Sequence, residues 1–152
     1  MDVINPVMWS LHVGFAILWT GSVLFVTLAV LPSALRGDVD GDALGAIVGR
    51  LRWITRLSAL AFLASGGHMA GTLYTFESLT GTGRGHLVLT MIALWFLITG
   101  LVEVASGKLT DGLDAGKLRQ PARDAKPFLY GAAGLSVALV VTAGLLAAPG
   151  AV

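Results

Sequence analysis

Three histidines are the residues of this sequence best suited to bind a metal ion or a cofactor. They are His12, His68 and His86, and each falls in a long, mostly apolar stretch. Ionisable side chains inside a membrane segment are costly and usually functional. Imidazole binds copper, and the thioether of Met8, four residues before His12, is a ligand type that selects Cu(I). The first hypothesis is therefore an outer-leaflet copper site formed by the three histidines, with Met8 as an auxiliary ligand.

The same histidines are compatible with a second chemistry, the binding of haem b. Two histidines on facing helices can supply both axial ligands of the iron. Glycines such as Gly66, Gly67 and Gly85 stand beside the histidines and would leave room for a flat ring, while Arg84 could pair with a propionate. A third interpretation is an accessory membrane subunit without a cofactor, in which each histidine only forms a hydrogen bond with a neighbouring group.

Four apolar stretches must position these side chains. A membrane-spanning helix needs about 20 apolar residues to cross about 30 Å of hydrocarbon, and backbone polar groups in lipid must be satisfied within the segment. The first stretch lies between Pro6 and Pro32, and proline favours both a helix start and a helix stop. The sequence predicts an all-α, integral membrane four-helix bundle in one domain, 1–152, with helices at about 7–31, 57–76, 86–105 and 128–148.

The distribution of Lys and Arg predicts how these helices are oriented. The expected loop 32–56 carries Arg36, Arg50, Arg52 and Arg56, and the expected loop 106–127 carries Lys108, Lys117, Arg119, Arg123 and Lys126. The connection between the second and third helices has only Arg84. Loops rich in Lys and Arg stay in the cytoplasm, so both termini are expected on the outer side of the cell membrane. This orientation places the three histidines in the same, outer half of the bilayer.

Composition excludes several other classes of protein. The chain is 55% hydrophobic and 12% charged, about half the charge of a typical soluble domain. Its net charge of +1 gives no reason to expect a nucleic-acid partner, and the absence of Cys excludes thiolate ligands. No Lys or Arg precedes Arg36, so we do not expect a cleavable signal peptide. No nucleophile–histidine–carboxylate set shares one depth, so we assign no catalytic residue.

Two further features predict helix–helix contacts. Glu103 falls in the last turn of the third helix, where it is expected to pair with Arg50, Arg52 or Arg56 rather than to serve a proton path. Gly67 and Gly71 form a G-x-x-x-G pattern, which is typical of close helix approach in membranes. The expected partners are membrane lipid and a copper ion, and a pore would require a homo-oligomer because four helices make a narrow bundle.

Short motifs in the first three helices resemble a known family. Leu11-His12-Val13-Gly14 followed by Leu18-Trp19-Thr20-Gly21-Ser22 resembles the first helix of CopD-like copper-resistance membrane proteins. Gly66-Gly67-His68 and Gly85-His86-Leu87 are compatible with that family, as is a looser similarity to HemJ-like haem-associated four-helix membrane proteins. Ser22 replaces the second glycine of the Trp-x-Gly-Gly pattern, and many CopD proteins are about twice as long. The resemblance implies copper uptake or handling, with a functional role for His12.

Overall fold

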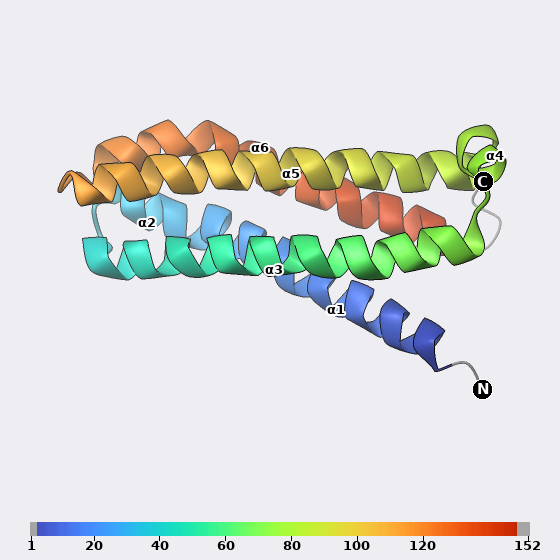
Figure 1. The fold of residues 1–152 in the computed structure, drawn as a ribbon. Coiled ribbons are helices and arrows are strands. Elements are labelled where there is room, and N and C mark those ends of the chain that lie inside the picture. Colours follow the sequence, from blue (N-terminus) through green and yellow to red (C-terminus); the bar gives the residue numbers. More distant parts are fainter. Residues whose placement is uncertain (1–2, 149–152) are drawn as a thin grey trace.

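The computed structural model describes residues 3–148, and every regular element in that range is a helix. The elements are α1 (Ile4–Phe25), the π-helical turn η1 (Val26–Val30), α2 (Leu31–Arg36), α3 (Gly41–Leu73), α4 (Phe76–Gly81), α5 (Gly83–Asp114) and α6 (Arg119–Ala147). Four long helical segments therefore run from 4 to 36, 41 to 73, 83 to 114 and 119 to 147. In Figure 1 consecutive long segments run in opposite directions, so that α1 begins and α6 ends at the end of the molecule that carries α4.

The first segment continues beyond the predicted stop at Pro32. Because proline has no backbone N–H and its ring crowds the preceding turn, the helix widens at η1, where the N–H of Leu31 donates to the carbonyl of Val26. A π-turn of this kind lets the chain remain helical through Pro32. The helix ends instead at Gly37, whose φ of 82° is a left-handed conformation that glycine adopts without strain. The expected end at residue 31 is therefore wrong.

Most of the expected loop 32–56 is helical as well. α3 begins at Gly41 because the carboxylate of Asp40 accepts hydrogen bonds from the N–H groups of Asp42 (3.0 Å) and Ala43 (3.1 Å). The buried residues of α3 recur at alternating spacings of four and three residues. This spacing is typical of helices that pack with a left-handed crossing. The residues on this side of α3 are Leu44, Val48, Leu51, Thr55, Ser58, Phe62 and Ser65. Only the turn 37–40 remains outside helices.

The expected loop 106–127 is also mostly helical. α5 continues to Asp114, and α6 begins at Arg119 rather than at 128. Pro127 lies inside α6, although the sequence places it at the start of the fourth helix. The turn between the two helices contains Gly116 with φ of 69°. α6 packs against α5 and buries several small residues, among them Ala122, Ala125, Ala132 and Ala133. Small buried residues allow neighbouring helices to pack closely.

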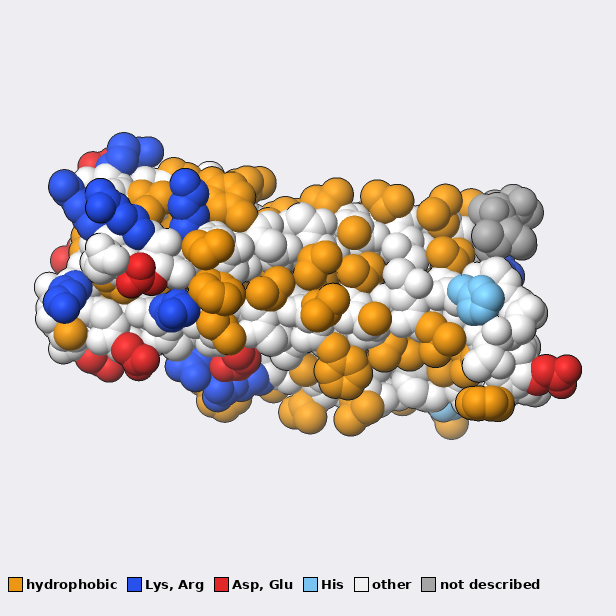
Figure 2. Space-filling model, turned by 90° about the horizontal axis from the view of Figure 1, so that it is seen from above, with side chains coloured by type: hydrophobic (Ala, Val, Ile, Leu, Met, Phe, Trp, Pro, Cys, Tyr) orange, Lys and Arg blue, Asp and Glu red, His pale blue; other side chains and the backbone are white. Residues whose placement is uncertain are grey.

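Three helical segments are long and apolar enough to cross a membrane, as expected for a membrane protein. They are Ile4–Arg36, Gly83–Asp114 and Arg119–Ala147. α3 is not among them, and its apolar stretch contains the polar and small residues from Ser65 to His68. Figure 2 shows hydrophobic side chains along the middle of the molecule and most Lys and Arg side chains at one end. We call this end, where α2 and α5 stop and α3 and α6 start, the basic end.

Glu103 joins α3 to α5 near the basic end, as the sequence predicts. The guanidinium of Arg56 donates two hydrogen bonds to the Glu103 carboxylate, from Nε to Oε1 (2.8 Å) and from Nη2 to Oε2 (3.1 Å). Arg52 forms a second ion pair with the same carboxylate at 3.4 Å. A planar, two-pronged contact of this type is among the stronger charged hydrogen bonds. Glu103 therefore has two structural partners, both on α3.

Within residues 3–148, the predicted close contact at Gly67 and Gly71 is not made. A Cβ atom built at either glycine would meet nothing within 4 Å, and both residues are exposed. The adjacent Gly66 instead faces α1, where a Cβ atom would lie 3.1 Å from Cε1 of His12. The small residue that permits close helix approach is thus Gly66, one position before the pattern identified in the sequence.

Candidate functional site

The packing surface between α1 and α3 carries a row of polar contacts, which we call the polar seam. Its three hydrogen-bonded pairs are Asn5 with His68 (2.9 Å), His12 with Ser65 (3.0 Å) and Trp19 with Thr55 (3.1 Å). The α1 members are spaced seven residues apart, and a seven-residue interval returns to nearly the same helix face. α1 and α3 are antiparallel, so the α3 members occur in the reverse order. Two of the three histidines predicted from the sequence therefore lie on one helix–helix contact.

The proton positions of His12 follow from its partner. The hydroxyl of Ser65 donates to the carbonyl of Ala61 (2.5 Å). This hydrogen bond uses the only proton of the Ser65 hydroxyl. The Ser65 oxygen must then accept the hydrogen bond from His12, so Nδ1 of His12 carries the proton. Nε2 keeps its lone pair, which is the form of imidazole that ligates a metal. A fixed proton on the other ring nitrogen is the usual way in which proteins orient a histidine ligand.

Aromatic and small residues hold the His12 ring in place. The ring of Phe62 lies against it with a centroid distance of 5.0 Å, and Phe62 also packs on Trp19 at 5.6 Å. Gly66 supplies the space on the α3 side, as described above. His12 is half-buried, whereas Trp19 is fully buried. The seam thus changes from a partly open region near α4 to a closed core in the middle of the molecule.

Met8 and His68 lie near the open part of the polar seam. Met8 follows Asn5 by three residues and precedes His12 by four, so all three share one face of α1, and Met8 is half-buried. The carbonyl oxygen of the Asn5 side chain accepts from Nε2 of His68, which leaves the lone pair on Nδ1 of His68. The seam therefore presents two histidines with unprotonated nitrogens and one thioether over neighbouring turns.

The third histidine is held elsewhere. His86 is exposed at the start of α5, and its Nε2 donates to the carbonyl of Thr80 in α4 (2.8 Å). Over residues 3–148, no group of three or more His, Asp or Glu side chains is placed to hold one metal ion. The structure therefore brings His12 and His68 to a common seam but gives His86 a separate partner.

Arg84 also has a partner of its own. Its Nη2 donates to the backbone carbonyl of Leu146 (2.9 Å), in the last turn of α6. Carbonyls in the last turn of a helix lack partners within the helix, and a cation is favourable at this end. The position fits a structural contact between the ends of α5 and α6 rather than a free cation beside the histidines.

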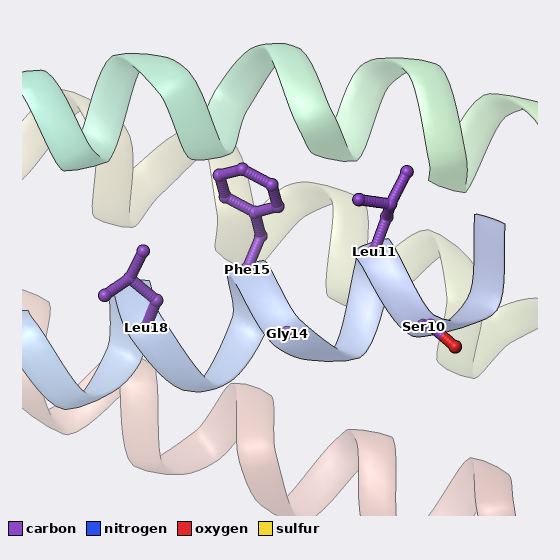
Figure 3. A pocket seen from close by; sticks show the side chains of 5 residues that line it. All are labelled: Ser10, Leu11, Gly14, Phe15 and Leu18. Carbon is purple, nitrogen blue, oxygen red and sulfur yellow. The ribbon is translucent and has the colours of Figure 1, made fainter. Parts of the chain in front are cut away.

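Two hollows of the surface lie on α1 beside the polar seam and include none of its hydrogen-bonded residues. Figure 3 shows a shallow one on α1, lined by Ser10, Leu11, Gly14, Phe15 and Leu18. A second lies next to it toward the start of α1. Both are mostly apolar and are lined by α1 alone, so they are features of the exposed side of this helix.

The two glycines before His68 provide a test of the His12 environment. Gly66→Ala is expected to displace the His12 ring, because the new methyl group would lie 3.1 Å from Cε1. Gly67→Ala adds the same group where nothing lies within 4 Å. We expect the NMR signal of the His12 imidazole to shift in Gly66→Ala and to stay in place in Gly67→Ala. Equal shifts in both variants would contradict the described contact.

Comparison with known proteins adds no family assignment. No family model, no curated protein sequence and no solved structure matches this chain.

Proposed function

We propose that this chain is a cell-membrane protein that crosses the bilayer four times. In this proposal α3 crosses the bilayer in addition to the three apolar segments named above. Two observations support α3 in this role. It packs against both α1 and α5, each of which is apolar enough to cross. Its outward side carries large apolar side chains such as Leu60 and Leu63, which are 65% and 66% exposed. Exposed leucines of this kind are expected where a helix faces lipid.

The proposed orientation has both termini on the outer side. The basic end collects the positive side chains that precede and follow the turns 37–40 and 115–118, and such residues favour the cytoplasmic side. The opposite end carries Arg84, which is bound to α6. An even number of spans then places the start of α1 and the end of α6 together outside, next to α4.

A reporter enzyme at the C-terminus tests this orientation. Alkaline phosphatase folds to an active form only outside the cytoplasm, so a fusion after residue 152 is expected to be active. A second fusion within the turn 115–118 is expected to be inactive. The reverse pattern would overturn the orientation, and activity at both sites would show that α6 does not cross the membrane.

Within this framework we propose that the protein binds copper at the outer part of the polar seam, through His12 and His68 with Met8 as an auxiliary ligand. The observation that carries the proposal is the hydrogen bond from His12 to Ser65, because it fixes a metal-ligating tautomer without using Nε2. Two imidazoles and a thioether form a donor set suited to Cu(I). The CopD-like resemblance of the residues around His12 agrees with this proposal.

The haem b alternative has less support. Gly66 is packed against His12 and leaves no gap there for a ring. Arg84, the candidate partner of a propionate, is bound to the end of α6. A cofactor-free accessory subunit would also use the polar seam, but only for helix packing. The copper and accessory proposals differ in whether Nε2 of His12 receives a ligand.

Metal content and an absorption spectrum of the purified protein separate the three proposals. For the copper proposal we expect one Cu(I) bound per chain in competition with a Cu(I) chelator, and no Soret band. A Soret band that is lost on replacement of His12 or His68 would support haem and overturn the copper proposal. A colourless protein that releases all copper to a weak chelator would support the accessory role.

A further inference from the structure

An exposed stripe on α6 combines two cations with an apolar surface. Arg123, Lys126 and Tyr130 are spaced by three and four residues, so they share one helix face. The same face continues with Gly134, Val137 and Val141. We call this set the α6 stripe, and all six residues are exposed: Arg123, Lys126, Tyr130, Gly134, Val137 and Val141.

The cations of the α6 stripe are not neutralised by the protein. Among the described residues, the ion pairs involve Arg36, Arg52 and Arg56, and none includes Arg123 or Lys126. The nearest acid in sequence, Asp124, points to another side of α6 and accepts a hydrogen bond from Gln120 (3.0 Å). The stripe therefore presents positive charge that is available to contact an anion from outside this chain.

The geometry of the α6 stripe matches the border of a membrane. The Lys126 ammonium lies 5.9 Å from the centre of the Tyr130 ring, and both lie where the charged part of α6 gives way to its apolar part. Tyrosine and lysine are favoured at this depth. Beyond them, Val137 and Val141 are 51% and 57% exposed. The distance from Tyr130 to Val141 is about 16 Å along the helix, close to half of a bilayer's hydrocarbon thickness.

Gly134 leaves a shallow gap in the middle of this apolar surface. A Cβ atom at Gly134 would meet nothing within 4 Å, and the residues on either side of it along the stripe carry full side chains. A flexible hydrocarbon chain can lie along such a surface. The negative headgroup and the hydrocarbon chain would then contact adjacent parts of one stripe.

We propose that the α6 stripe binds one anionic phospholipid. Arg123 and Lys126 contact the phosphate, the Tyr130 ring lies at the level of the glycerol, and an acyl chain follows Gly134, Val137 and Val141. With the proposed orientation of the chain, this lipid belongs to the inner leaflet. The lipid site itself depends only on the membrane position of α6, so it does not require the proposed copper function.

The charge part of this proposal is tested by two double variants with equal changes in net charge. Arg123→Gln with Lys126→Gln removes both stripe cations. Arg50→Gln with Lys117→Gln removes two exposed cations at the same end but on α3 and in the turn before α6. Each basic residue near an anionic membrane surface changes binding by about fivefold. We expect at least about tenfold weaker binding for the stripe variant and less than about twofold for the control.

Binding is measured by native mass spectrometry of the full chain in detergent with phosphatidylglycerol or phosphatidylcholine. The wild-type chain is expected to retain one phosphatidylglycerol in preference to phosphatidylcholine. Equal retention of the two lipids, or equal losses in the two double variants, would overturn the proposal in favour of general charge attraction. Displacement of the lipid by millimolar inorganic phosphate would also overturn it, since the site would then recognise phosphate alone.

The acyl-chain part is tested by Gly134→Leu. This change adds a bulky side chain on the exposed side of α6, where a Cβ atom meets nothing within 4 Å. We expect phosphatidylglycerol retention to fall at least about threefold, while the melting temperature in detergent stays unchanged or rises because Leu is favoured over Gly in a helix. Unchanged retention in this variant would contradict the path along Gly134, and a lowered melting temperature would contradict its lipid-facing position.

Discussion

Replacing His12 with Ala is expected to weaken Cu(I) binding by more than about 100-fold, because the variant lacks the oriented Nε2 ligand of the polar seam. Ser65→Ala removes only the group that fixes the proton on Nδ1. Loss of such an orienting partner typically costs about 10- to 100-fold in metal affinity. The affinities are measured by competition with a Cu(I) chelator on the purified protein.

His86→Ala is the matched control for this experiment. Its imidazole donates to the Thr80 carbonyl in α4 and does not belong to the seam, so Cu(I) affinity should change by less than about twofold. A loss as large as that of His12→Ala would favour the three-histidine site predicted from the sequence. Unchanged binding in both variants would exclude the polar seam as the copper site.

Gly112→Ala is expected to lower the stability of the protein by about 1–3 kcal/mol, the usual cost of forcing extra volume into a packed contact. A Cβ atom at Gly112 would overlap the ring of Pro121, where α5 turns into α6. The proline ring cannot rotate away, since it is closed on its own backbone. The clash must therefore be relieved by a shift of α6 against α5. Such a shift disturbs the packing between these two helices.

Gly107→Ala makes the same chemical change five residues earlier on α5. Nothing lies within 4 Å of a Cβ atom there, and Ala is favoured over Gly in a helix by up to about 1 kcal/mol. Thermal unfolding in detergent, followed by circular dichroism, should show a lower melting temperature for Gly112→Ala. Gly107→Ala should show an unchanged or higher one. Equal shifts in both variants would contradict the described packing at the turn.

The positions of the apolar stretches were predictable from the sequence, but the ends of the helices were not. The expected loops 32–56 and 106–127 were assigned where apolar residues become scarce. A helix that leaves the bilayer loses its need for apolar residues without losing its backbone hydrogen bonds. α3 illustrates this: the segment 43–48 has helical spacing in the sequence, and Leu44, Val48 and Leu51 follow the four–three spacing that continues to Ser65.

The two prolines were misleading for a related reason. Proline is disfavoured inside helices, yet α-helical segments accommodate it when the freed backbone groups are satisfied locally. At Pro32 the widened turn η1 provides that accommodation. At Pro127 the helix extends by two turns toward the basic end. Neither outcome can be derived from the proline alone, since both depend on what the flanking residues pack against.

The candidate site was predictable in part. The location of His12 and His68 within apolar stretches indicated interior positions, and the pairing of Glu103 with Arg52 and Arg56 is confirmed. The partners of the histidines were missed, although the seven-residue spacing of Asn5, His12 and Trp19 was visible. Depth along a helix follows from counting residues, whereas the side that each histidine faces depends on how α1 and α3 pack.

The Trp19–Thr55 pair of the polar seam also fixes the axial register of α1. Two apolar helices with a seven-residue repeat can slide past each other by one repeat, about 10.5 Å, and still interlock. Such a slip would place the Trp19 indole against Val48 or Phe62 instead of Thr55, and neither side chain can accept its proton. A buried donor left in this state is costly. Trp19 and Thr55 therefore determine how far below the membrane surface His12 lies, although neither residue touches it through a hydrogen bond.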